Sequence, residues 1–115
     1  MLTILKLLRT NSFVKEFVVV DFIEDKIPQY YFYLKIIVTL TDASTLHIKE
    51  YRSADERNYS YHWQKNENLI IRWDNAPHHK DLANFPHHKH DPNPSPSSEI
   101  EIHEVFSYIS KILKK

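Results

Sequence analysis

Alternation of apolar and polar side chains over residues 30–40 constrains this chain more than any other feature. Every second position is apolar, at Phe32, Leu34, Ile36, Val38 and Leu40. This spacing places the five side chains on one face of an extended strand. The intervening positions are mostly polar or amphipathic, with Ile37 among Tyr31, Tyr33, Lys35 and Thr39. The pattern predicts a β-strand with one buried and one accessible face.

Four further segments have strand character, at residues 13–24, 45–52, 57–65 and 69–74. The links between successive segments are short and hold turn-forming residues such as Asp25 and Pro28. Short links between sequential strands imply antiparallel neighbours. We therefore expect residues 12–74 to form a five-stranded antiparallel meander.

Helical spacing of apolar residues marks the two ends of the chain. Leu2, Leu5 and Leu8 predict a short helix within residues 1–10. Near the other end, Ser98 and Glu101 have the spacing of a capping box and predict a helix over residues 98–113. Its apolar stripe would consist of Ile102, Val105, Phe106, Ile109, Ile112 and Leu113.

Residues 75–98 have neither period and hold five of the six prolines and five of the eight histidines. We expect a His- and Pro-rich loop that ends in an extended, polyproline-like DPNPSPSS segment. At 115 residues the chain suits a single domain. The predicted class is α+β, with both helices packed on one face of the sheet.

Composition excludes several kinds of function. Lys and Arg together number 15, as do Asp and Glu, so the net charge is zero and bulk attraction to nucleic acid is not expected. The absence of cysteine excludes disulfides and thiolate chemistry and favours a cytoplasmic location. The N-terminus resembles no signal peptide, and no segment approaches the ~20 apolar residues of a membrane span.

The accessible sheet face should carry His47, Lys49, His62, Arg72 and Asp74. His62 and Arg72 are expected to be cross-strand neighbours because the turn between their strands is short. Glu50 is ambiguous: alternation places its carboxylate on the apolar face, where burial is costly. A bulge would instead move it to the polar face, beside His62, as a candidate base.

Two strings concentrate the chemistry, RWDNAPHH at 72–79 and FPHHKH at 85–90. Histidine can accept and donate protons near neutral pH, and Arg or Lys can stabilise charge that develops on a phosphate. These groups suit metal-independent cleavage of RNA, with Asp74 orienting a histidine. The candidate catalytic residues are His62, Arg72, Asp74, His78, His79, His87, His88, Lys89 and His90.

Other interpretations stay open. His78, His79, His87, His88 and His90 offer enough nitrogen ligands for a metal, although their spacing matches no established pattern and no cofactor is expected. A bound metal would make the chain a metal-dependent nuclease or hydrolase. Alternatively, the loop and the polar face would form a non-catalytic module that binds a protein or a nucleic acid, and some loop histidines would be purely structural. Tyr59 and Tyr61 could stack on unpaired bases, but an alternating aromatic stripe is typical of core beneath a helix. Tyr59, Tyr61, Asn75 and Glu50 are the candidate binding residues.

The strings YSYHWQ at 59–64, RWDNAPHH and FPHHKH resemble the TumE-like family of toxin–antitoxin proteins. The resemblance covers about residues 30–112, and Lys80-Asp81 is a peripheral departure from it. It implies a toxin-like component whose partner is a helix-turn-helix antitoxin; RNA and a second copy of the chain remain open as further partners. The matching positions are Tyr59, Tyr61, His62, Trp63, Arg72, Trp73, Asp74, Asn75, Pro77, His78, His79, Phe85, Pro86, His87, His88, Lys89 and His90. The resemblance implies no particular reaction.

Overall fold

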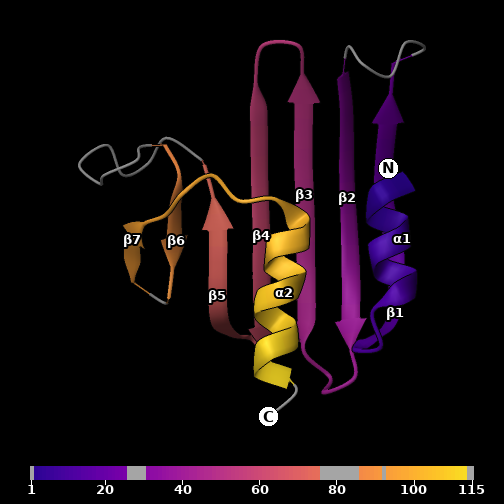
Figure 1. Ribbon diagram of the computed structural model, residues 1–115, viewed down its shortest axis with the longest axis vertical. Helices are drawn as coiled ribbons and strands as arrows, with labels where there is room; N and C mark the ends of the chain where they lie inside the picture. Colours follow the sequence, from indigo (N-terminus) through magenta and orange to yellow (C-terminus); the bar gives the residue numbers. More distant parts are fainter. Residues whose placement is uncertain (1, 26–30, 76–85, 92, 114–115) are drawn as a thin grey trace.

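The chain folds as an antiparallel sheet with two helices on one of its faces (Figure 1). The computed structural model describes residues 2–25, 31–75, 86–91 and 93–113. The helices are α1 (Leu2–Thr10) and α2 (Ile102–Leu113). The strands are β1 (Val14–Glu24), β2 (Tyr31–Leu40), β3 (Thr45–Ser53), β4 (Arg57–Lys65), β5 (Asn68–Asp74), β6 (His88–His90) and β7 (Pro94–Pro96).

The strands lie side by side in sequence order from β1 to β7, and every neighbouring pair is antiparallel. The predicted α+β class and meander are confirmed. The predicted number of five strands is wrong because β6 and β7 lie in the segment expected to be irregular. Each has only three residues, too few to display a period of two.

The core lies between the sheet and the helices. In β2 the alternation is as predicted, with Leu34, Ile36, Val38 and Leu40 fully buried. α1 contributes Ile4 and Leu8, and α2 contributes the buried part of its stripe. That part consists of Ile102, Val105, Phe106 and Ile109. Tyr59, Tyr61, Trp63, Ile71 and Trp73 complete the layer from β4 and β5, so the aromatic stripe is core beneath α2.

The start of α2 differs from the prediction. The helix begins at Ile102, and the Glu104 carboxylate accepts a hydrogen bond from the backbone N–H of Glu101 at 3.3 Å. Glu101 is therefore the N-cap, and Glu104 supplies the return bond of a capping box. Ser98 lies outside the helix, so the predicted start was several residues too early.

No helix in the described part of the chain combines the length and the apolar character that crossing a bilayer requires. β1 forms one edge of the sheet and exposes several of its apolar side chains, including Val18 and Ile23. β7 forms the other edge, where prolines are tolerated because an edge strand need not donate every backbone N–H.

The chain has no glycine, so other residues occupy left-handed backbone positions. Among the described residues these are Ala43 at φ 71°, Asn66 at 53° and Glu67 at 66°. Ala43 closes the β2–β3 turn, where its N–H donates to the Leu40 carbonyl at 3.0 Å. A residue with a Cβ atom pays a steric penalty in this conformation, and glycine does not.

We expect Ala43→Gly to raise the free energy of unfolding by about 0.5–1 kcal/mol, because relief of the steric penalty exceeds the extra entropy of the unfolded chain. Equilibrium urea denaturation measures this change. Ala54→Gly is the control, since Ala54 is exposed and is not in the left-handed region. Equal changes in the two variants would contradict the assignment of strain to Ala43.

Candidate functional site

The sheet face opposite the helices carries two parallel rows of polar side chains. Strand register aligns the first row as Lys35, Lys49, Ser60, Asp74 and His88. The second row, one pleat away, consists of Ile37, His47, His62, Arg72 and His90. We call this surface the open face. Side chains two positions apart on a strand share a face, so five strands bring histidine, arginine and lysine together.

Hydrogen bonds connect the middle of the open face. The guanidinium of Arg72 lies between two partners: Nε donates to Asp74 Oδ2 at 2.9 Å, and Nη1 is 3.2 Å from His62 Nδ1. His62 Nε2 is in turn 2.8 Å from Gln64 Oε1. Because guanidinium only donates and an amide oxygen only accepts, His62 has its proton on Nε2. Asp74 thus holds Arg72, and Arg72 sets the tautomer of His62.

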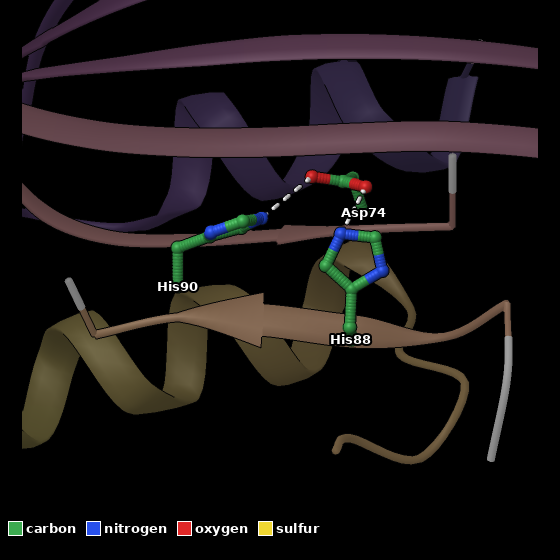
Figure 2. A group of neighbouring side chains, drawn as sticks. All are labelled: Asp74, His88 and His90. Atoms are coloured by element: carbon green, nitrogen blue, oxygen red, sulfur yellow. Dashed lines mark ion pairs between the residues drawn. The ribbon is translucent and has the colours of Figure 1, made fainter. Parts of the chain in front are cut away.

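Asp74 also contacts two histidines of β6 (Figure 2). His88 Nε2 is 2.8 Å from Asp74 Oδ1, and His90 Nε2 is 3.8 Å from Oδ2. The sequence predicted that Asp74 would orient a histidine, and the structure places the His88 ring beside it. Its Nδ1 donates to the Pro86 carbonyl at 2.9 Å.

His47 and His62 lie edge to face on adjacent strands, with ring centroids 6.0 Å apart. Burial lowers the pKa of His47, and the positive charges of His62 and Lys35 lower it further. Burial also lowers the pKa of His62; its hydrogen bond to Gln64 opposes this shift, and the charge of Arg72 adds to it. Both rings therefore favour the neutral form, which can accept a proton.

Two neighbouring hollows of about 280 and 340 Å³ lie on the open face. Lys49, Ser60 and Arg72 line both of them. One hollow extends past His47 and His62, and the other extends past Tyr33 and Tyr51. A ligand that spans both would meet cations and histidines at one end and aromatic rings at the other.

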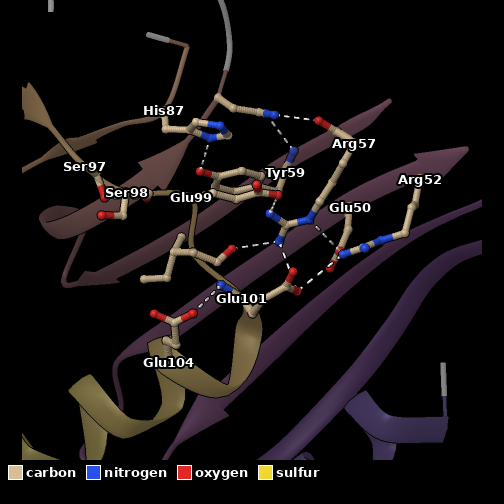
Figure 3. Close-up of polar contacts among 12 residues, drawn as sticks. Glu50, Arg52, Arg57, Tyr59, His87, Ser97, Ser98, Glu99, Glu101 and Glu104 are labelled. Atoms are coloured by element: carbon tan, nitrogen blue, oxygen red, sulfur yellow. Dashed lines mark hydrogen bonds and ion pairs between the residues drawn. The ribbon is translucent and has the colours of Figure 1, made fainter. Parts of the chain in front are cut away.

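Glu50 does not reach the open face. The register of β3 is continuous against both neighbours, so there is no bulge and Glu50 lies on the covered face. Its carboxylate is buried and lies 3.3 Å from Arg57 Nε (Figure 3). The Tyr61 hydroxyl donates to it at 3.1 Å. Arg52 also bonds to it at 2.9 Å. These partners offset the cost of burial, and the suggestion that Glu50 moves beside His62 is wrong.

Other candidates lie outside the two rows of the open face, although Tyr59 and Asn75 line the edge of one of its hollows. The Tyr59 hydroxyl is 2.9 Å from His87 Nδ1, and burial raises the pKa of Tyr59 to about 12. Asn75 accepts a hydrogen bond from Tyr59 N at 2.9 Å and donates to the Arg57 carbonyl, which extends the pairing of β5 with β4. Lys89 lines a hollow beside α2. His78 and His79 lie outside the described residues.

The structure adds three residues to the candidate site, His47, Lys49 and Lys35. Alternation in the sequence placed His47 and Lys49 on the polar face, but the histidines are denser further along the chain. Alternation gives the face of a strand residue, whereas its cross-strand neighbours depend on register. Alternation alone therefore could not predict that His47 is paired with His62.

The fold and the open face define a small α+β protein with a histidine–arginine–lysine site on a sheet surface. A family model described as Toxin TumE matches residues 4–114. The chain therefore belongs to the TumE toxin family, and the match extends the resemblance seen over residues 30–112. Family membership indicates the toxin component of a toxin–antitoxin system and implies an antitoxin partner. No curated protein and no solved structure matches the chain.

Proposed function

We propose that the chain is an RNA-cleaving toxin whose active site is the open face. The main support for this proposal is the row formed by His47, His62 and Arg72, with Lys35 and Lys49 in the adjacent row. Cleavage of RNA without metal requires a base, an acid and a cation for the phosphate. The two adjacent rows of the open face supply a base, an acid and a cation.

In the proposed reaction, the ribose 2′-oxygen attacks phosphorus while one histidine removes its proton. The bond from phosphorus to the 5′-oxygen then breaks, and the second histidine protonates the leaving oxygen. The products are a 2′,3′-cyclic phosphate and a 5′-hydroxyl end. Arg72 holds the phosphate through its Nη atoms, because Asp74 occupies Nε. Movement of Nη1 to the phosphate would release His62 Nδ1 for proton transfer.

The charge distribution supports local and not bulk attraction to RNA. The whole chain is neutral, but Lys35, Lys49 and Arg72 gather on the open face. Tyr33 and Tyr51 lie opposite one another on β2 and β3, where unpaired bases could stack. The proposed substrate is therefore single-stranded RNA. A helix-turn-helix antitoxin as the partner rests on the family resemblance alone.

The test uses purified chain and two synthetic RNAs that differ by one 2′-deoxy substitution at the cleaved position. We expect cleavage of the first RNA, with cyclic phosphate ends, and none of the second at that position. Cleavage should persist in chelator because the chemical steps use protein side chains alone. Intact RNA in both reactions, together with intact cellular RNA after induction of the toxin, would refute the proposal.

The pH dependence follows from the two histidines. Activity needs one neutral and one protonated ring, and both pKa values are lowered from 6.5. We expect kcat/KM to be greatest below pH 6.5, to fall at lower pH as both rings gain protons, and to fall at higher pH as both lose them. Arg72→Gln removes a charge that lowers the pKa of His62, so the acidic limb should move to higher pH.

The pH–rate profile and NMR titration of His62 measure this shift. Lys111→Gln is a suitable control, because it also removes one positive charge but lies on α2. An acidic limb that stays in place in Arg72→Gln would show that His62 is not the base.

A further inference from the structure

Asp74, His88 and His90 form a compact group of metal-ligating side chains at the junction of β5 and β6 (Figure 2). One ligand atom from each lies within 4.8 Å of the others. Register produces this arrangement, because Asp74 is paired with His88, and His90 lies two positions further along β6 on the same face. Two imidazoles and a carboxylate thus converge without a dedicated loop.

The hydrogen bonding of His88 indicates a cation beside its second nitrogen. The Pro86 carbonyl accepts from Nδ1 at 2.9 Å, so Nδ1 carries a proton. In a neutral ring the Nε2 lone pair then faces Asp74 Oδ1 at only 2.8 Å. Two lone pairs at this distance repel unless a proton or a metal ion lies between them. A backbone carbonyl bound to the far nitrogen is also how metal-ligating histidines are commonly oriented.

Burial strengthens the need for a positive charge between Asp74 and His88. Asp74 is 3% exposed and His88 is 2% exposed, and buried charge is costly unless it is paired or bound to metal. Arg72 neutralises Asp74 from the Oδ2 side, which leaves Oδ1 directed at His88. Because the Arg72 side chain is 38% exposed, solvent screens its repulsion of a nearby metal ion.

The ligand set selects the kind of ion. Imidazole nitrogen and carboxylate oxygen suit zinc and related transition metals, whereas calcium and magnesium prefer oxygen alone. Around a tetrahedral zinc ion, ligand atoms lie about 3.3 Å apart. His88 Nε2 is 2.8 Å from Asp74 Oδ1, and His90 Nε2 is 3.8 Å from Asp74 Oδ2. The three ligand atoms lie within 4.8 Å of one another, so side-chain rotations would bring them to the spacing that a tetrahedral ion requires.

We propose that Asp74, His88 and His90 bind one divalent transition-metal ion of the zinc class and that the ion fastens β6 to β5. These three ligands, taken from the described residues, would fill three of the four positions around a tetrahedral ion. The ion would fix Asp74, which lines one hollow of the open face, and through it the guanidinium of Arg72. The site does not depend on which reaction the open face performs.

Isothermal titration of the full chain with Zn²⁺, after removal of any histidine tag, tests the proposal. We expect one equivalent to bind and saturating Zn²⁺ to raise the melting temperature by about 5 °C or more. His90→Gln should weaken binding by at least about 100-fold, since loss of outer-shell groups alone typically costs 10–100-fold. His90 is only partly buried, so this variant should fold even if variants of His88 do not.

Two controls separate this site from the other histidines. His103→Gln, on the exposed surface of α2, and the double variant His78→Gln/His79→Gln should keep one tight equivalent. The proposal is overturned if Zn²⁺ fails to bind, if His90→Gln binds as tightly as the wild type, or if the double variant loses the tight equivalent. Absence of Zn²⁺ binding would assign the cation beside His88 Nε2 to a proton.

Discussion

Replacing Arg57 with alanine is expected to lower the free energy of unfolding by about 3–5 kcal/mol, the usual effect of removing one partner from a buried ion pair. The Arg57 side chain is 9% exposed and lies 3.3 Å from the buried Glu50 carboxylate. Its Nη2 also donates to the Tyr61 hydroxyl at 2.8 Å and to the Ile100 carbonyl at 2.7 Å. The substitution therefore removes part of the positive charge that offsets burial of the Glu50 carboxylate. It also removes the hydrogen bond between Arg57 and the segment that leads into α2.

Arg52→Ala is the matched control, because Arg52 contacts the same Glu50 carboxylate at 2.9 Å. Its side chain is 41% exposed, and exposed ion pairs typically contribute about 0–1 kcal/mol. Equilibrium urea denaturation of both variants measures the difference. Similar small losses in the two would show that burial does not govern the strength of these ion pairs.

The second large effect concerns activity: His62→Ala is expected to reduce RNA cleavage at least about 100-fold, the lower end of the usual contribution of a general acid or base. His47→Ala should have a similar effect, since each ring performs one of the two proton transfers. The two losses should not add in the double variant, because the histidines act in one reaction. Single-turnover cleavage of a labelled RNA measures these losses.

His103→Ala provides the control for the removal of a histidine, since His103 is exposed on α2. Unfolding curves verify that His47→Ala and His62→Ala remain folded. Full cleavage activity in both folded variants would exclude the two rings as the acid and the base. A loss in His62→Ala alone would place the second proton transfer elsewhere on the open face.

The fold was largely predictable because its long strands carry their own signal. β2 has ten residues, and its burial alternates from Leu34 to Leu40. The short turns leave antiparallel neighbours as the simple topology. β6 was not predictable in this way, since His88 to His90 form a strand only by pairing with β5. The start of α2 was placed too early because Ser98 and Glu101 have capping spacing, whereas the return bond comes from Glu104.

The candidate site was predictable in composition and less so in arrangement. His62 and Arg72 were expected to be neighbours, and the register pairs them. Glu50 was uncertain because its partner Arg57 lies seven positions away on the next strand. The loop histidines separate, with His88 and His90 at Asp74 and His87 at Tyr59. These histidines are close together in the sequence, but the pleat of a strand places successive side chains on opposite faces of the sheet.

Alternation along β3 and β4 also has an evolutionary consequence. Ile48 and Tyr61 are fully buried, whereas their chain neighbours His47 and His62 belong to the open face. Under the proposed function, selection for folding and selection for activity act on different, interleaved positions of the same strands. Substitutions of surface residues away from buried features usually change stability by less than about 0.5 kcal/mol. The exposed positions of the open face, such as Lys35 and Lys49, can therefore vary without compensating changes in the core, whereas Asp74 and His88 are buried.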